Sequence, residues 1–182
     1  MLFTPTPISE SWTIDPTPHL DDRGRFMRAW CTDEFEAHGI AFTPVQANMG
    51  LSTRKGTLRG MHYQVEPHGE AKLMRCTRGI IFDVLVDLRP GSKTYGQWFG
   101  LELSAENGRM LYIPPLCAHG YQTLEDNTEI YYMTSARYVP SSARGLRFDD
   151  SAVGVRWPLP PISMSEQDRN WPLLHSEPNS PR

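Results

Sequence analysis

The sequence predicts a mainly-β protein, built as a sandwich or a small barrel. From about residue 57 to residue 138, short runs of β-branched and aromatic residues recur. Glycine, proline and Asn-Gly turn signals separate these runs, and the long amphipathic helices of βαβ units are missing. The 182 residues, of which 39% are hydrophobic and 21% charged, fit a single domain over 1–182 with a sizeable core.

The N-terminal region is expected to be extended, with one short helix. Residues 1–20 are rich in Pro, Thr and Ser, and an extended piece around 8–14 is expected to pair with a sheet edge of the same or a neighbouring subunit, as an exchanged strand would. Thr32-Asp33-Glu34, followed by Gly39, predicts a capped helix of about two turns. The segment 43–52 is expected to be extended again.

The central region is expected to supply most of the strands. The run 81–88 would place Phe82, Val84 and Val86 on one face of a strand. Further strands are predicted at 57–64, 97–103, 109–113, 119–124 and 128–138. After residue 140 Pro and Ser become frequent, a short helix is predicted near 165–170, and residues 172–182 are predicted to fray.

Charge and cysteine content exclude several classes of protein. The net charge of −3 argues against nucleic acid or an anionic membrane as the main partner. Cys31, Cys76 and Cys117 are an odd number without metal-ligand spacing, so reduced thiols in a cytoplasm are expected. No N-terminal targeting signal and no apolar run long enough to span a membrane is present.

The stretch Lys55–Gln64, K-G-T-L-R-G-M-H-Y-Q, concentrates chemistry in ten residues. It holds two cations, two glycines, an imidazole, a phenol and an amide, and such density predicts a site. In a regular strand Arg59, Met61 and Tyr63 would share one face, and His62 would lie on the other. Gly60 would let the backbone bend or be approached closely. A lone strand histidine is more often structural than catalytic, so the rest of the chain must decide.

Several motifs resemble one family in order and in spacing over about residues 20–170. They are Asp22-Arg23-Gly24, Lys55–Gln64, Lys72-Leu73-Met74-Arg75-Cys76, Gly79–Arg89, Leu103-Ser104-Ala105-Glu106-Asn107, Ile113-Pro114, Ala118-His119-Gly120-Tyr121 and Trp157-Pro158. Together they resemble the dTDP-4-dehydrorhamnose 3,5-epimerase family. The resemblance implies a cupin-type jelly roll with a few short helices, a homodimer, and action on a nucleotide-linked 4-keto-6-deoxyhexose without metal or redox cofactor. The family also contains relatives that epimerise one carbon only.

The residues can be tested against that chemistry. A hydrogen on a carbon beside a ketone is weakly acidic, so its removal needs a base, a cation or donor at the ketone oxygen, and a proton source on the opposite face. The resemblance gives these roles to His62, Lys72 and Tyr132, respectively. It also gives Asp168 the position of the carboxylate that orients and supports the imidazole. Taken singly, Lys72 fits a solvated lysine, Tyr132 a core aromatic and Asp168 a helix cap equally well.

The resemblance also places several residues at the substrate. The matching residues are Arg23, Gln46, Asn48, Arg59, His119 and Tyr138. Arg23 and Arg59 match phosphate contacts, a role that suits the planar donor set of a guanidinium. Tyr138 matches a residue that stacks on the nucleotide base, and His119 a further active-site imidazole. For Gln46, Asn48 and Tyr138 a purely structural role is equally compatible with the sequence.

One position departs from the family pattern. Five residues after the motif arginine, where dTDP-sugar members carry a glutamate, this chain has Arg28. Thymine and uracil present an N3–H donor that a carboxylate accepts, whereas cytosine presents two acceptors that suit an arginine. The sequence therefore raises the hypothesis that the protein tolerates or prefers a CDP-linked sugar.

Two other classes of cupin remain as alternatives. A metal-dependent cupin needs three or more converging ligands, typically from an H-x-H pair, but this chain has His62-Tyr63-Gln64 there; His62, His68 and His119 would have to converge. A non-catalytic sugar-binding cupin would explain the fold and the arginines without requiring the four proposed catalytic side chains together. The favoured prediction is a cofactor-independent epimerase that inverts C3 and C5 through an enolate, with a 3- or 5-epimerase as the nearest alternative.

Overall fold

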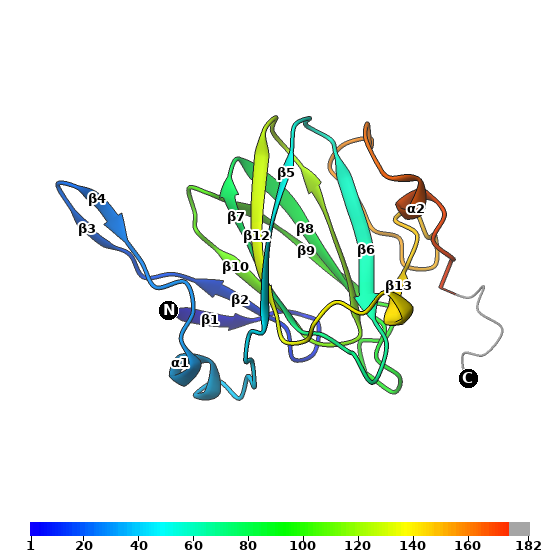
Figure 1. The fold of residues 1–182 in the computed structure, drawn as a ribbon, viewed down its shortest axis with the longest axis horizontal. Helices are drawn as coiled ribbons and strands as arrows, with labels where there is room; N and C mark the ends of the chain where they lie inside the picture. The colour runs from blue at the N-terminus through cyan, green and yellow to red at the C-terminus, as the bar shows by residue number, and fades with distance from the viewer. Residues whose placement is uncertain (175–182) are drawn as a thin grey trace.

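Two antiparallel sheets face each other in the computed structural model, which describes residues 1–174 (Figure 1). The six-stranded sheet has the order β1-β2-β10-β7-β12-β5, and its strands are β1 (Leu2–Pro5), β2 (Trp12–Asp15), β5 (Gln46–Ser52), β7 (Lys72–Arg78), β10 (Met110–Ile113) and β12 (Thr128–Thr134). The five-stranded sheet has the order β13-β6-β11-β8-β9, with β6 (Leu58–Gln64), β8 (Ile80–Asp87), β9 (Trp98–Ser104), β11 (Cys117–Thr123) and β13 (Ala143–Gly145). This double-sheet arrangement is that of the cupin-type jelly roll.

The main core lies between the two sheets. Met74 and Ile130 come from the six-stranded sheet, while Ile81, Leu85 and Leu103 come from the five-stranded one, and all are buried. Side chains alternate across each strand, so β8 turns Val84 and Val86 to the opposite face, as predicted. There the C-terminal region covers the sheet.

The outer face of the six-stranded sheet is covered near its lower end by the short helix α1 (Thr32–Glu36). The helix buries Phe35 against Phe42 and Tyr112. Its prediction is confirmed, and Gly39 follows it with φ +72°, the left-handed conformation that favours glycine. The predicted cap is wrong, because the N-cap is Cys31 and it makes no side-chain hydrogen bond.

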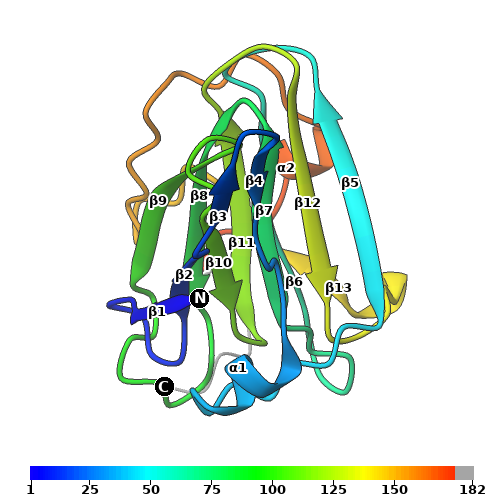
Figure 2. The ribbon, with the colours of Figure 1, turned by 90° about the vertical axis from the view of Figure 1, so that its left-hand side faces the viewer.

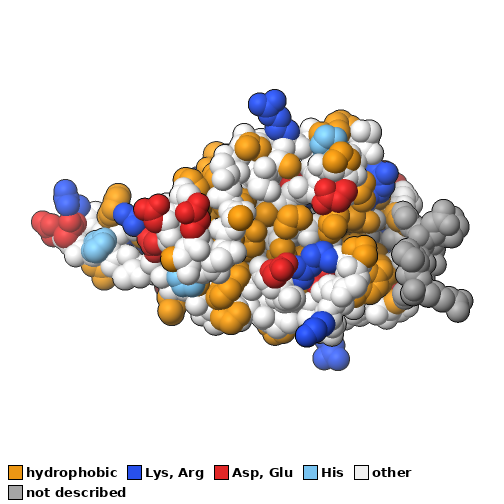
Figure 3. All heavy atoms as spheres, turned by 90° about the horizontal axis from the view of Figure 1, so that it is seen from below, with side chains coloured by type: hydrophobic (Ala, Val, Ile, Leu, Met, Phe, Trp, Pro, Cys, Tyr) orange, Lys and Arg blue, Asp and Glu red, His pale blue; other side chains and the backbone are white. Residues whose placement is uncertain are grey.

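The strand β1 pairs with β2, and β2 pairs with β10 of the same chain. After them the hairpin of β3 (His19–Asp21) and β4 (Gly24–Phe26) projects away from the sandwich (Figure 1), and it lies in front of the sheets in Figure 2. Its end carries both acidic and basic side chains beside hydrophobic ones, as the view from below shows (Figure 3). The apolar side chains of Leu20 and Phe26 on this hairpin are each 76% exposed.

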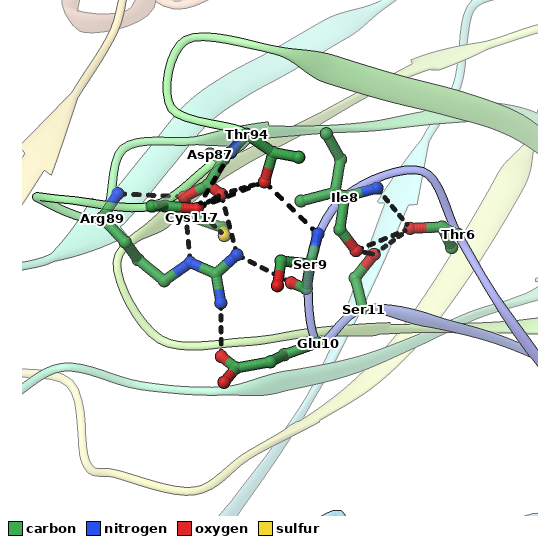
Figure 4. Close-up of polar contacts among 10 residues, drawn as sticks. Thr6, Ile8, Ser9, Glu10, Ser11, Asp87, Arg89, Thr94 and Cys117 are labelled. Atoms are coloured by element: carbon green, nitrogen blue, oxygen red, sulfur yellow. Dashed lines mark hydrogen bonds and ion pairs between the residues drawn. The ribbon is translucent and has the colours of Figure 1, made fainter.

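A buried carboxylate fastens the N-terminal loop to the turn after β8 (Figure 4). Asp87 accepts hydrogen bonds from Arg89, Ser92 and Thr94, and Arg89 also reaches the Glu10 carboxylate at 2.5 Å and the Ser9 carbonyl at 2.7 Å. Burial alone would raise the pKa of Asp87, but the hydrogen bonds outweigh it and lower the pKa to about 2. The charged form of Asp87 is therefore part of the folded structure.

The last described segment packs onto the sandwich. The 3-10 helix η1 (Pro140–Ser142) leads into β13, and the predicted short helix is present as α2 (Glu166–Arg169). Of the predicted fraying tail, residues 172–174 are described, and there the Pro172 carbonyl and the Leu174 amide are both hydrogen-bonded. Residues 175–182 lie outside the described part. No helix within residues 1–174 is long and apolar enough to cross a bilayer.

The strand β6 departs from the regular alternation that the sequence predicts. His62 lies opposite His119 and Arg59 lies opposite Tyr121, so β6 has one more residue than β11 between the two pairs, which is a β-bulge. At the bulge Gly60 has φ +122°, and an added Cβ would lie 2.5 Å from the Cα of Gly120. The prediction that Arg59 and His62 face opposite sides is wrong, because the extra residue turns both toward the space between the sheets.

Candidate active site

A pocket opens between the sheets and consists of two adjoining hollows of about 360 and 260 Å³. His62, Lys72 and Tyr132 line both hollows, and they come from β6, β7 and β12, respectively. His62 and Tyr132 are about seventy positions apart in the chain and lie in different sheets. The fold thus gathers three of the four predicted catalytic residues around one space.

The fourth predicted residue lies directly beside the first. The Nε2 atom of His62 is 2.7 Å from Oδ1 of Asp168, which the short helix α2 supplies beside β6. The imidazole side chain is 44% exposed, whereas the carboxylate side chain is only 6% exposed. A buried carboxylate on one ring nitrogen leaves the other nitrogen, Nδ1, as the one that can exchange protons with a ligand.

Two further donors hold the Asp168 carboxylate, and a helix cap fixes its backbone. The Gly60 amide donates to Oδ2 at 3.3 Å and the Trp171 indole to Oδ1 at 3.3 Å, while Ser165 caps α2 by accepting from the Asp168 amide at 3.0 Å. Burial by itself raises the pKa of Asp168, but the hydrogen bond and charge of His62, with the donors around it, bring the pKa below its ordinary value. The carboxylate is thus held in its ionised form beside the imidazole.

Lys72 brings a cation into the same pocket. Its Nζ donates to the His62 carbonyl at 3.3 Å and lies 3.2 Å from Oε1 of Glu70. The two side chains are each only 9% exposed. The described contacts use two of the three N–H groups of the ammonium, so one remains to meet a ligand oxygen.

Tyr132 faces the pocket from β12. It lies opposite Asn48 of β5 and Met74 of β7 in the register of the six-stranded sheet. Burial, and next the negative charge of Glu70, raise the pKa of Tyr132 above its ordinary value. The phenol is therefore protonated throughout the neutral range and able to donate.

Two more predicted residues line the smaller hollow. Arg59 donates from Nε to the Ser52 hydroxyl at 3.2 Å and reaches the Leu51 carbonyl at 3.4 Å. His119 lies 2.7 Å from Asp83, a second imidazole–carboxylate pair whose side chains are 8% and 0% exposed. Arg59 and His119 therefore face the same space as His62.

The larger hollow holds the predicted base-contacting residues. Gln46 donates to the Asn48 side chain at 3.2 Å, and its own oxygen accepts from the Tyr138 amide at 3.4 Å. The Tyr138 ring is at the mouth of this hollow, and the residue is 59% exposed. An exposed aromatic ring beside two amides is a suitable platform for a flat heterocycle.

The structure does not bring Arg23 and Arg28 to this pocket. Arg23 lies on the projecting hairpin, where its 85% exposed side chain pairs with Asp21 at 2.5 Å. Arg28 follows the hairpin and pairs with Glu34 at 2.8 Å, and its side chain is 61% exposed. Glu34 also holds the N-terminal ammonium at 2.7 Å. Neither arginine lines either hollow.

The pocket also contains residues that the sequence alone did not single out. They are chiefly Glu70, Trp171, Gln167 and Arg144. Glu70 could have been found, because a residue two positions before Lys72 shares its side of an extended segment. Trp171 carries no such signal, since its place beside His62 in the pocket depends on how the C-terminal region packs against β6. No three His, Cys, Asp or Glu side chains within 1–174 are grouped so that they could hold a metal ion.

Comparison with known proteins agrees with the fold. The double-sheet fold with its inner polar pocket defines a cupin-like protein. Residues 5–176 match the sequence model of the family described as dTDP-4-dehydrorhamnose 3,5-epimerase. The chain belongs to this family.

Individual relatives are similar over nearly the whole chain. A dTDP-4-dehydrorhamnose 3,5-epimerase of Sinorhizobium fredii is 43% identical over 175 residues, which are 96% of this chain and 90% of that protein. The crystal structure of the enzyme of the same name from Elizabethkingia anophelis has a TM-score of 0.92, with 36% identity and 96% of each chain covered. A Legionella pneumophila dTDP-6-deoxy-D-glucose-3,5-epimerase, solved with dTDP-4-keto-L-rhamnose, has a TM-score of 0.89, with 36% identity and 94% and 92% coverage. The predicted family and cupin-type fold are confirmed.

Proposed function

We propose that this protein is an epimerase that inverts C3 and C5 of a dTDP-linked 4-keto-6-deoxyhexose through an enolate, as a step in making a rhamnose-type deoxysugar. The observation that carries the proposal is the 2.7 Å contact between His62 and Asp168 in a pocket that Lys72 and Tyr132 also line. These four side chains supply a base, its supporting carboxylate, a cation and a proton donor. A sugar-binding protein without activity would not need all four.

Each inversion requires two proton transfers. His62 Nδ1 takes the proton from the carbon beside the ketone, and the electrons of the C–H bond form the enolate. The Lys72 ammonium stabilises the negative oxygen, and Asp168 stabilises the imidazolium that forms. Tyr132 then gives its phenolic proton to the opposite face of the same carbon. Exchange of protons with water returns His62 to its neutral form and Tyr132 to its protonated form.

The remaining pocket residues suit the nucleotide and the diphosphate. Arg59 and His119 present donors beside the reacting groups, where a diphosphate oxygen would accept them. Tyr138 would stack on the base, with Gln46 and Asn48 as adaptable amide contacts. Relatives named for dTDP sugars make thymine the expected base. A CDP-linked sugar remains the alternative that Arg28 raises.

We propose further that the protein is a homodimer and that Arg23 acts on the partner's substrate. Arg23 matches a phosphate contact of the family, yet it lies on a hairpin that projects away from its own pocket. The same hairpin exposes Leu20 and Phe26, and β5 at the sheet edge exposes Met49 and Leu51, which are 65% and 49% exposed. Association of two copies would cover these apolar side chains.

Mixed dimers test this arrangement. Light scattering should give twice the chain mass of 20.7 kDa. Arg23→Ala and His62→Asn chains, each impaired alone, should regain about a quarter of wild-type activity when co-expressed in equal amounts, because half of the dimers then hold one intact site. A monomer, or a mixture no more active than its parents, would contradict an Arg23 contribution in trans.

The activity itself is tested by product analysis. The purified protein should convert dTDP-4-keto-6-deoxyglucose into a product with inverted C3 and C5, as NMR coupling constants report. The same incubation with the CDP-linked sugar measures base preference. Inversion of C3 alone or C5 alone would favour a single-carbon epimerase, and an unchanged sugar that still binds would favour the non-catalytic cupin.

We also place the protein in the cytoplasm, with a small-molecule substrate and neither nucleic acid nor membrane as a partner. The support is the set of three free thiols, Cys31, Cys76 and Cys117, of which the last two are buried. Burial raises the pKa of Cys76 to about 11 and that of Cys117 to about 12. Both side chains are therefore neutral and behave as core residues.

A further inference from the structure

We propose that Glu70 is a positioning residue of the active site, which holds the Lys72 ammonium at the enolate oxygen and keeps Tyr132 ready as a proton donor. This inference rests on the proposed epimerase function and extends it to a residue that has no assigned role. Glu70 lies just before β7, two positions ahead of Lys72, and lines the larger hollow.

The backbone around Glu70 is fixed, so its side chain has a defined direction. The sheet pairing of β7 with β12 continues one residue beyond the strand, because the Ala71 amide donates to the Ser135 hydroxyl at 2.8 Å and the Ser135 amide donates to the Ala71 carbonyl at 3.0 Å. In an extended segment the residues on either side of Ala71 point to the same face. Glu70 and Lys72 therefore both point into the pocket.

The contact between the two side chains is short and largely removed from water. Oε1 of Glu70 is 3.2 Å from Nζ of Lys72, and each side chain is 9% exposed. Buried ion pairs are much less screened than surface pairs, and removing one partner leaves the other charge uncompensated. Because the His62 carbonyl accepts from the same Nζ at 3.3 Å, the two acceptors together define where the ammonium lies relative to the base.

Glu70 also acts on the proton donor. Its negative charge opposes ionisation of the nearby phenol, and after burial it is the second cause of the raised pKa of Tyr132. One carboxylate thus has two consequences, a fixed cation on one side and a protonated phenol on the other. The first depends on an acceptor atom at Oε1, whereas the second depends on the charge, so different substitutions separate them.

Two variants of Glu70 make that separation. Glu70→Gln keeps an oxygen that can accept from Lys72 but removes the charge, so kcat near neutral pH should fall by less than about tenfold. The alkaline limb of its kcat–pH profile should move to lower pH, since Tyr132 loses the charge that favours its protonated form. Glu70→Leu removes the acceptor as well, and its kcat should fall on the order of tenfold or more at every pH.

Matched measurements keep the test decisive. Glu66→Gln makes the same charge change at an exposed residue of the preceding loop and should leave both kcat and the alkaline limb unchanged. Thermal melting reports whether each variant folds. If Glu70→Gln does not fold, Glu70→Asp provides the test, because it keeps the charge. Its alkaline limb should lie at the same pH as that of the wild type, while its kcat should be lower.

The outcomes separate this inference from the function on which it rests. Suppose that the wild type epimerises the sugar. An alkaline limb of Glu70→Gln at the wild-type pH, or a wild-type kcat of Glu70→Leu, would then contradict the proposed role of Glu70 and leave the epimerase function intact. A displaced limb in Glu70→Asp would also contradict it. If the wild type itself does not act on the keto-sugar, the proposed function fails first.

Discussion

His62 and Asp168 are 106 residues apart in the chain, yet their Nε2 and Oδ1 atoms lie 2.7 Å apart. Asp168 is buried and ionised, whereas His62 is half exposed toward the pocket. This asymmetry suits an imidazole that gains and loses a proton while its carboxylate partner keeps a constant charge.

Removal of the negative charge of Asp168 should slow the reaction strongly. In Asp168→Asn the amide can no longer stabilise an imidazolium and can hold the ring in the wrong tautomer, so we expect kcat to fall by about one to four orders of magnitude. Steady-state kinetics with the keto-sugar measure the loss. Glu166→Gln, a charge removal at an exposed position of the same helix, should retain wild-type kcat. Equal kinetics for the two variants would remove Asp168 from the mechanism.

Loss of the phenolic hydroxyl should separate proton removal from inversion. Tyr132→Phe leaves His62 and Lys72 in place, so deuterium from the solvent should still enter C3 and C5 while the yield of inverted product falls sharply. Mass spectrometry follows the exchange and NMR follows the configuration. The control is Tyr131→Phe, the neighbouring residue on the opposite face of β12. If exchange and inversion fall together, Tyr132 is not the donor on the far side.

The strands of the sandwich could be predicted because their signal is local. Phe82, Val84 and Val86 alternate with buried residues of the opposite face, and β8 has that pattern. The bulge in β6 could not be predicted, since the extra residue is visible only against its partner strand β11. For the same reason the sequence placed Arg59 and His62 on opposite faces.

The candidate site was predictable only in part. His62 stood out by local density, but its pairing with Asp168 came from resemblance to a family, because no local pattern links residues in β6 and α2. Glu70 was missed although it lies two residues from Lys72. The position of Arg23 on a hairpin that projects away from the pocket is a property of the folded chain that a three-residue motif does not encode.

The reversed charge at position 28 should influence which nucleotide binds. Arg28 lines neither hollow of its own chain, so it would meet the base in the partner's site of the proposed dimer. There Arg28→Glu should shift the ratio of dTDP to CDP affinity toward dTDP by about tenfold or more, as one charged hydrogen bond would. Titration calorimetry gives both dissociation constants. Arg28→Gln is the control, since it also breaks the Glu34 ion pair without reversing the charge. An unchanged ratio in Arg28→Glu would remove this residue from base selection.

The buried Asp87 network should make stability depend on pH in acid. The pKa of Asp87 falls from 3.8 to about 2 on folding, so its contribution is fully present above pH 3.8 and is lost as the pH falls through about 2. Because the side chain is fully buried, we expect Asp87→Asn to lower the free energy of unfolding by about 2 kcal/mol at pH 7. Urea unfolding at several pH values should show the difference from wild type shrinking below pH 3.8.

The exposed Asp22 offers a matched control for that measurement. Asp22→Asn should change the free energy of unfolding by less than about 0.5 kcal/mol, as surface substitutions usually do. A gap between wild type and Asp87→Asn that stays constant from pH 7 to pH 2 would mean that the packing of Asp87, and not its charge, stabilises the fold.

The central claim is that His62 removes the proton beside the ketone, and solvent exchange tests it most directly. Wild-type protein, His62→Asn and the control His68→Asn are incubated with dTDP-4-keto-6-deoxyglucose in deuterated water, and NMR follows the signals of C3–H and C5–H. Wild type and His68→Asn should lose both signals, whereas His62→Asn should keep both while still binding dTDP with near wild-type affinity. Wild-type exchange in His62→Asn would contradict the assignment of His62 as the base.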